Sequence, residues 1–441
     1  MKQILSFFFA LAITFSLHAQ DRAFAKQVVD TLASPSMHGR GYVNKGDKIA
    51  AKYISDEYKS FGLLSFNMAG SYYQEFTFPV NTFPGNMSLT VTTQDGKKVQ
   101  CVPGQQFLVR PESPSVKGNF PVVLLDSAIV YDDAKWTAFR SMNLKKSFVM
   151  VDTSGVRGLR QLQYMKDFAQ YPHDVKGLLF PVKPNPIAGS DNCSKLSPWD
   201  FSMKQSAISS FEIDYAFRRI TAIEVNVTAK FLKNYKSQNV IGYVRGSEEP
   251  DSFIVFTAHY DHLGQMGKDT YFPGANDNAS GIAMLLSLAR YYSMPEHKPK
   301  CSIVFMAFSA EEVGLIGSRY FTMHPLFPMK AIRFLINMDI LGTGDEGITV
   351  VNATLFDPEF KKLQKMNSDS SYLAVVKPRG KAPISDHFFF TEWGVPSFYI
   401  YTLGGIKAYH DTCDRRETLP LTKFESLFAL LRDFADWEDR K

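Results

Sequence analysis

Cysteine is scarce in this sequence, with four residues in 441: Cys101, Cys193, Cys301 and Cys413. They are scattered, and no two of them form a CxxC pair. A scaffold built from disulfides and a zinc site made of thiolates are therefore both excluded. Cys101 and Cys193 fall in the same middle region of the chain, so they are the candidates for a disulfide.

An excess of charge of one sign is also missing. The chain has 49 Lys and Arg residues against 44 Asp and Glu residues, which gives a net charge of +5 spread along its length. No basic run and no zinc-finger spacing accompanies this small excess. We therefore expect no nucleic-acid partner.

Long apolar runs are absent apart from residues 4–17. Lys2 precedes this run and the small residue Ala19 follows it, which is the pattern of a secretory signal peptide over residues 1–19. A membrane span needs about 20 apolar residues, so we expect no stable membrane insertion. An uncleaved N-terminal anchor is the alternative, and no cysteine stands where a bacterial lipoprotein needs one. The sequence thus predicts a chain exported to the periplasm or the extracellular space.

What the sequence does contain is enough apolar material for a large core. Hydrophobic residues make up 45% of the chain and aromatic residues 14%, which excludes wholesale disorder. At about 100–200 residues per domain, the length predicts two or three domains. The class is soluble and globular.

The chain changes character twice along its length. Residues 20–71 carry two helical patterns, over 22–33 and 48–63. Residues 72–233 consist of short β runs interrupted by Pro, Gly and Asn, with one helical pattern at 159–168. The clearest of these runs are 88–93, 120–125, 147–151, 177–182 and 222–231. We expect a β-rich insertion over residues 72–233.

From residue 234 to 441, strands and helices alternate. The predicted strands are 239–245, 253–258, 302–308, 333–338, 348–352 and 397–401, and the predicted helices are 279–292, 311–323, 358–366 and 422–437. The strands are almost continuous apolar runs, which is typical of parallel strands covered by helices on both faces. The predicted fold class is α/β, with a mixed, mostly parallel sheet flanked by helices and a β-rich insertion domain.

A glycine-rich motif at residues 342–347 fits the pattern GxGxxG and follows a predicted strand. A dinucleotide site needs a helix that begins at these glycines. Residues 348–352 form another strand here, so we interpret the motif as a turn.

Polar side chains gather where the predicted strands end. In open α/β sheets, ligands bind outside the carboxyl ends of the strands. The segments at these ends are His259-Tyr260-Asp261-His262, Asn276-Asp277-Asn278, Glu311-Glu312, Asp339 and Tyr409-His410. Each has an ordinary structural explanation when taken alone. Together they supply the imidazoles and carboxylates of a two-metal hydrolytic site, which suits Zn²⁺ better than Mn²⁺ or Co²⁺.

These segments, with Ser385-Asp386-His387, occur in an order that resembles the co-catalytic zinc aminopeptidase family, which also includes glutamate carboxypeptidase-like enzymes and glutaminyl cyclases. The resemblance covers residue 239 to the end and the segment around residues 37–41. It implies the zinc exopeptidase type of fold for residues 234–441, with residues 20–71 as its N-terminal helices. The insertion resembles a protease-associated domain without a sharp motif, and we expect a lid or a wall over the cleft.

The resemblance also implies a role for each matching residue. It makes His259 and Asp339 the ligands of one zinc ion, Glu312 and His410 the ligands of another, and Asp277 the bridge between two ions per chain. Asp261 is expected to hold the His259 ring. Glu311 is expected to be the general base, and Tyr409 either stabilises the oxyanion or packs. His262 stays unassigned, while Asp386 and His387 are expected to be structural or to line the cleft.

The function predicted from the sequence is an exported two-zinc aminopeptidase that acts on peptides or oligopeptides. The alternatives are a glutaminyl-peptide cyclase with one zinc, a glutamyl carboxypeptidase and, less favoured, a binding scaffold without catalysis. His259 is retained along with the second metal's carboxylate, which argues against the cyclase. The residue preference, mono- or dipeptide release and the oligomeric state stay open.

Overall fold

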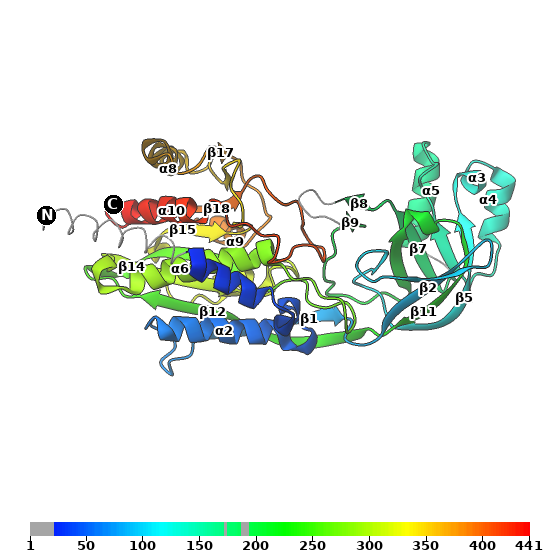
Figure 1. Cartoon of the computed structure of the whole chain (residues 1–441), viewed down its shortest axis with the longest axis horizontal. Helices are drawn as coiled ribbons and strands as arrows, with labels where there is room; N and C mark the ends of the chain where they lie inside the picture. Colours follow the sequence, from blue (N-terminus) through cyan, green and yellow to red (C-terminus); the bar gives the residue numbers. More distant parts are fainter. Residues whose placement is uncertain (1–21, 172–173, 187–193) are drawn as a thin grey trace, which may run out of the picture.

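The computed structural model describes residues 22–171, 174–186 and 194–441. The described strands form two sheets of eight strands each and a small two-stranded one, β8 (Asn185–Pro186) with β9 (Ser194–Lys195). The two large sheets lie beside each other along the long axis of the molecule (Figure 1). The predicted signal peptide lies outside the described residues.

The sheet that carries the strand-end residues has the order β1-β12-β14-β13-β15-β18-β16-β17. Its strands are β1 (Tyr73–Thr82), β12 (Lys230–Val244), β13 (Glu249–His259), β14 (Cys301–Phe308), β15 (Ile332–Met338), β16 (Ile348–Val351), β17 (Val376–Pro378) and β18 (Ser397–Thr402). Parallel pairing joins β14, β13, β15 and β18 at its centre, while β1, β12 and the β16–β18 pair run antiparallel. The predicted mixed, mostly parallel sheet is confirmed.

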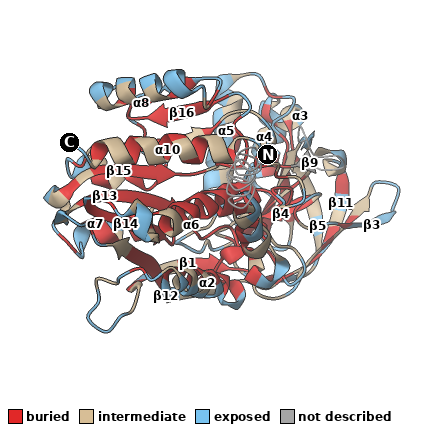
Figure 2. Cartoon of the chain, turned by 60° about the vertical axis from the view of Figure 1, so that its left-hand side comes forward, coloured by how far each residue is buried: buried red, intermediate tan, exposed pale blue. Residues whose placement is uncertain are grey.

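Helices cover both faces of this sheet, because its central strands are apolar on both sides. Ile254 and Phe256 of β13 pack with a helix over residues 22–32 and with α2 (Gly46–Ser60), α6 (Ser280–Ser293), α8 (Asp357–Ser370) and α10 (Phe424–Glu438). The intervening Val255 faces α7 (Ile316–Met323) and α9 (His387–Glu392) on the other side. Figure 2 shows the resulting band of buried strands.

The second sheet has the order β3-β2-β11-β5-β6-β7-β10-β4. Its strands are β2 (Met87–Thr93), β3 (Lys98–Cys101), β4 (Phe107–Val109), β5 (Val116–Leu125), β6 (Phe148–Val151), β7 (Gly177–Val182), β10 (Ser209–Asp214) and β11 (Ile220–Val227). Three helices, α3 (Ser127–Val130), α4 (Asp133–Arg140) and α5 (Leu159–Gln170), pack on one face of its parallel half. The sequence indicated only the last of them.

Three expectations about the elements are wrong in detail. β1 lies within the predicted insertion, yet it pairs with β12 in the sheet that carries the strand-end residues, with Tyr73 opposite Val240. The predicted run 222–231 is interrupted, because β11 ends at Val227 and β12 begins at Lys230. The predicted helix 311–323 begins only at Ile316, since the positive φ angles of Ala310 (58°) and Leu315 (59°) turn the chain before it.

The glycine motif at residues 342–347 connects β15 to β16 without a helix, as expected for a turn. Cys101 and Cys301 are free and buried, whereas Cys413 is disulfide-bonded. The predicted pairing of Cys101 with Cys193 is therefore wrong, and Cys193 itself lies outside the described residues. Among the described helices, none combines the length and the apolar character that crossing a membrane requires.

Candidate active site

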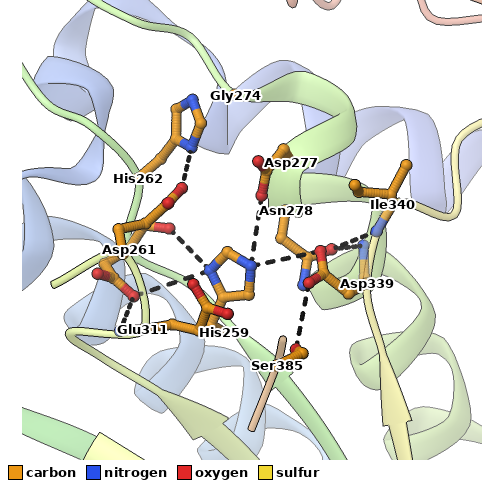
Figure 3. A network of polar contacts seen from close by, with 12 residues as sticks. His259, Asp261, His262, Gly274, Asp277, Asn278, Glu311, Asp339, Ile340 and Ser385 are labelled. Carbon is orange, nitrogen blue, oxygen red and sulfur yellow. Dashed lines mark hydrogen bonds and ion pairs between the residues drawn. The ribbon is translucent and has the colours of Figure 1, made fainter. Parts of the chain in front are cut away.

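Seven of the eight predicted site residues line one cavity of about 360 Å³: His259, Asp277, Glu311, Glu312, Asp339, Tyr409 and His410. They meet because β13, β14, β15 and β18 are neighbours that run in the same direction, so their carboxyl ends share one edge of the sheet. His259 is the last residue of β13, and Asp339 directly follows β15. The eighth residue, Asp261, is buried and lies beside the His259 ring (Figure 3).

Asp277 lies between two groups of side chains. Its Oδ1 is 3.3 Å from Nε2 of His259, and its Oδ2 is 3.3 Å from Nε2 of His410. Each imidazole has a second carboxylate partner. Asp339 Oδ1 is 3.3 Å from His259 Nε2, and Glu312 Oε2 is 3.0 Å from His410 Nε2. The five residues thus form two three-membered groups that share one carboxylate.

The Glu311 carboxylate belongs to the side of the cavity next to His259. One of its oxygens lies within 4.8 Å of ligand atoms of His259 and Asp339. The adjacent Glu312 instead faces His410, because the turn before α7 directs the two neighbouring side chains differently. Tyr409 is 42% exposed at the cavity wall, and its ring stacks on His410 with 3.9 Å between the ring centroids.

The electrostatics of the cluster favour bound positive charge. Burial penalises the negative charge of Asp277 and Glu312, but hydrogen bonds from His259 and His410 hold the pKa of Asp277 well below its usual range. Charges on His410 and His262 likewise outweigh burial and lower the pKa of Glu312 to about 2. Burial and the neighbouring charge of Glu312 raise the pKa of Glu311 well above its ordinary value. Such a set of carboxylates attracts cations.

The donor atoms fit zinc. Zinc bonds of about 2.0–2.2 Å in a tetrahedron place the ligand atoms roughly 3.3–3.6 Å apart. The four nitrogen-to-oxygen separations in the two groups are 3.0–3.3 Å, close to this spacing. Imidazole nitrogens and carboxylate oxygens without thiolates are also the donors of catalytic zinc sites. The two groups can therefore each hold one ion, with Asp277 reaching both.

The contact between Asp261 and His259 differs from the expectation. The His259 Nδ1 atom lies 3.1 Å from the backbone oxygen of Asp261 and 3.8 Å from the carboxylate Oδ1. The carboxylate instead accepts hydrogen bonds from the hydroxyl of Tyr42 (3.0 Å) and the backbone N–H of Glu311 (3.2 Å). Asp261 thus links the support of His259 to the backbone of Glu311.

Asp386 and His387 are buried and do not line the cavity. Their neighbour Ser385 donates a hydrogen bond to Oδ2 of Asp339 at 3.2 Å and accepts one from Asn337 at 2.8 Å. Burial raises the pKa of Asp386 to about 7 and lowers that of His387 to about 3. This segment therefore supports Asp339 from behind, in agreement with a structural role.

Four supporting residues were missed or left unassigned by the sequence analysis. Nδ1 of His262 lies 2.6 Å from Glu312 Oε1, and Asp200 lies 3.0 Å from His410 Nδ1. Asp414 accepts the backbone N–H groups of Asn276 and Asp277 at 2.8 and 2.9 Å. The buried guanidinium of Arg40 donates to five carbonyl oxygens: those of Leu32, Tyr260, Pro273, Gly274 and Asp277. His262 and Asp414 each follow a predicted ligand by a few residues, and Arg40 lies in the segment 37–41 that the resemblance covers, whereas Asp200 gave no signal.

The comparisons with known proteins point to the class of zinc-dependent hydrolases. Residues 239–435 match the model of Peptidase family M28. An aminopeptidase of Bacillus subtilis (strain 168), YwaD, is 32% identical over 185 residues, which are 40% of this chain and 37% of that protein. A probable zinc metalloprotease of Pyrenophora tritici-repentis is 39% identical over 113 residues, 25% of this chain and 23% of the relative. The chain thus matches less than half of the length of these relatives.

A solved structure extends the comparison to the whole fold. The peptidase M28 precursor from Shewanella amazonensis SB2B superposes with a TM-score of 0.68 at 15% identity, covering 97% of this chain and 96% of that one. At this identity the likeness shows a shared fold, insertion included. The resemblance to the co-catalytic zinc aminopeptidase family is confirmed, and so are the α/β fold class and zinc as the metal of the family.

Proposed function

We propose that the protein is an exported metallopeptidase that uses two zinc ions to hydrolyse the peptide bond next to a free N-terminus. The observation that carries this proposal is the position of Asp277, whose two carboxylate oxygens each lie 3.3 Å from a different imidazole nitrogen. We assign His259 and Asp339 to one ion, Glu312 and His410 to the other, and Asp277 to both. The named aminopeptidase among the relatives supports the exopeptidase activity.

Two bound zinc ions would polarise the carbonyl group of the substrate and lower the pKa of a water molecule. The Glu311 carboxylate accepts a proton from the attacking water and passes it to the leaving amine. Burial and the neighbouring charge of Glu312 raise the pKa of Glu311, and bound cations would lower it. The Tyr409 hydroxyl donates a hydrogen bond to the carbonyl oxygen as negative charge develops there. Burial raises the pKa of Tyr409, so this hydroxyl stays protonated.

The substrate proposal is a peptide or oligopeptide that enters through the cavity. Besides the polar cluster, its walls include Ile340, Ile384, Tyr399 and Tyr401, which offer apolar surface to the first side chain of a substrate. We further propose a signal peptide at residues 1–19, N-terminal helices of the peptidase at 20–71, an insertion at 72–233 and the peptidase domain at 234–441. β1 then serves as an edge strand contributed from inside the insertion.

Two measurements test the proposal. Atomic emission on the purified chain should give about two zinc ions per molecule after mild dialysis. A stoichiometry near one contradicts the shared-carboxylate assignment and favours a cyclase-like site. Hydrolysis of a substrate panel should require a free amine, with N-acetylated peptides cleaved poorly and N-terminal Gln peptides not cyclised. Equal cleavage of free and acetylated peptides contradicts the exopeptidase assignment.

A further inference from the structure

A segment of the insertion reaches the candidate active site at His410. The backbone N–H of Trp199 donates to the backbone oxygen of His410 at 3.0 Å. In the next residue, Oδ1 of Asp200 lies 3.0 Å from Nδ1 of the His410 ring. Both residues belong to the connection between β9 and β10, so the His410 loop is held through backbone and side chain by the same short segment.

Trp199 fixes the position of this segment between the two parts of the chain. Its side chain is buried, and its indole N–H donates to the backbone oxygen of Val109 in β4 at 2.7 Å. Its ring stacks on Phe272, with 5.1 Å between centroids and an interplanar angle of 8°. Phe272 comes from the loop between β13 and α6, where Leu263 and Met266 also pack into the insertion core. The packing of Trp199 thus determines where the carboxylate of the next residue, Asp200, lies.

Asp200 contacts His410 at the ring nitrogen that does not face the predicted metal ligands, and one of its carboxylate oxygens lies within 4.8 Å of ligand atoms of both His410 and Glu312. Nε2 of His410 faces Glu312 Oε2 and Asp277 Oδ2, whereas Nδ1 faces Asp200. A neutral ring whose Nε2 binds a metal must carry its proton on Nδ1, and a carboxylate that accepts a hydrogen bond from this N–H fixes the tautomer and the ring orientation. Asp200 is 61% exposed, so its charge stays hydrated and ready to accept the hydrogen bond.

The support of the other imidazole has a different origin. His259 Nδ1 contacts the backbone oxygen of Asp261, two residues further along the same chain segment. The orientation of His259 is therefore set within the peptidase domain, while that of His410 depends on a residue from the insertion.

We propose that Asp200 is a positioning residue through which the insertion completes the metal site of His410. The inference rests on the proposed two-metal function, because it concerns one of the two sites. It assigns the insertion a role beyond covering the cleft: the insertion contributes a carboxylate that orients an imidazole ligand. The contacts of Trp199 with Val109, Phe272 and the His410 backbone tie the position of this carboxylate to the packing of the insertion on the peptidase domain.

The first test is the stepwise zinc affinity of the full-length chain after its metal has been removed with a chelator. In wild-type protein we expect two binding steps. Asp200→Ala should weaken one step by about 10- to 100-fold and leave the other unchanged. Asp200→Asn should restore part of the affinity, since its amide oxygen still accepts a hydrogen bond from Nδ1. Asp133→Ala is the matched control, because it removes an exposed carboxylate of α4 in the same insertion.

The second test places the same substitution in two backgrounds. His259→Ala leaves the His410 site, and Asp200→Ala should lower the remaining affinity there. His410→Ala leaves the His259 site, where Asp200→Ala should have no effect. Equal effects in both backgrounds, or none in either, overturn the inference, as does an equal loss in Asp133→Ala. Failure of the proposed function has a separate signature, because the wild-type chain then binds fewer than two ions or does not hydrolyse peptides.

Discussion

The Nδ1 atom of His262 lies 2.6 Å from Oε1 of Glu312, the carboxylate whose other oxygen faces His410. His262 is buried, and its ring packs against Gly274, where a β-carbon would come within 2.4 Å of the imidazole. Gly274 also has a positive φ of 59°, so this position favours glycine twice over. The pair holds Glu312 in one orientation from the side away from the cavity.

We predict that His262→Ala weakens zinc binding at the Glu312 site. The substitution leaves Oε1 of Glu312 buried without its hydrogen-bond donor, and loss of such outer support costs about 10- to 100-fold in metal affinity. Stepwise zinc titration of the metal-free chain measures the change. His262→Gln keeps an N–H donor and should retain more affinity, and His324→Ala, at an exposed histidine, should bind zinc like wild type. Unchanged affinity in His262→Ala contradicts the orienting role.

The adjacent residues Glu311 and Glu312 should respond differently to the same change. Glu311→Gln should keep both zinc ions and the folded structure but lose about 10²- to 10⁴-fold in kcat, because an amide does not accept a proton at neutral pH. Glu312→Gln should lower zinc occupancy, since its Oε2 lies 3.0 Å from His410 Nε2 in the proposed second metal site. Measuring metal content and kcat together distinguishes a general base from a metal ligand. Loss of metal in Glu311→Gln with retention in Glu312→Gln reverses the two roles.

Arg40 should be essential for stability although it does not line the cavity. Its guanidinium is fully buried and donates to carbonyl oxygens of the loop that carries Asp277, including Pro273 and Gly274 at 2.7 Å. Burial lowers the pKa of Arg40 to about 10, so it remains charged at neutral pH. We expect Arg40→Lys to lower the free energy of unfolding by about 3–5 kcal/mol, because Lys lacks the fork of donors.

Chemical denaturation of the metal-bound chain measures this loss. Arg140→Lys changes an exposed arginine of α4 in the same way and should shift the free energy of unfolding by less than about 0.5 kcal/mol. Equal stability of the two variants contradicts a structural role for the Arg40 guanidinium.

Asp47 should make stability depend on pH in the acidic range. It is buried in the first turn of α2 and accepts hydrogen bonds from the hydroxyls of Tyr235 (2.6 Å) and Ser237 (2.7 Å). Burial outweighs these bonds and raises the pKa of Asp47 to about 6, above the ordinary value of 3.8. The folded state therefore holds its proton more tightly than the unfolded state, and the contribution of Asp47 to stability falls as pH rises from about 4 to about 6.

The variant Asp47→Asn isolates this effect. Relative to wild type, its free energy of unfolding should improve by about 3 kcal/mol as pH rises through this window, which corresponds to a pKa difference of about two units. Urea unfolding at several pH values measures the difference between the two chains. Asp133→Asn, at an exposed carboxylate, should show no such trend. A constant difference between Asp47→Asn and wild type contradicts the raised pKa.

The sequence by itself determined the central α/β architecture and seven residues that meet in one cavity. Apolar runs such as β14 (Cys301–Phe308) are visible locally, because a strand buried on both faces needs hydrophobic side chains throughout. Parallel neighbours end at the same edge of a sheet, so polar residues after those runs, such as Asp339, were predictable as a group. His259 and His410 followed from the same reasoning and from the order of the motifs.

Only the tertiary structure decided which charged residues are buried or contact the site from remote parts of the sequence. Asp200 and Asp47 look like ordinary surface charges in the sequence, and the segment around Arg40 does not reveal the contacts of that residue, because the partners of all three lie far away along the chain. The pairing of β1 with β12 could not be predicted for the same reason. The neighbour of an edge strand depends on tertiary packing and not on the hydrophobic pattern of the strand itself. The local sequence specifies whether a segment forms a strand, a helix or a turn. The burial of charges and the docking of the insertion depend on how distant segments pack, and no local pattern records that packing.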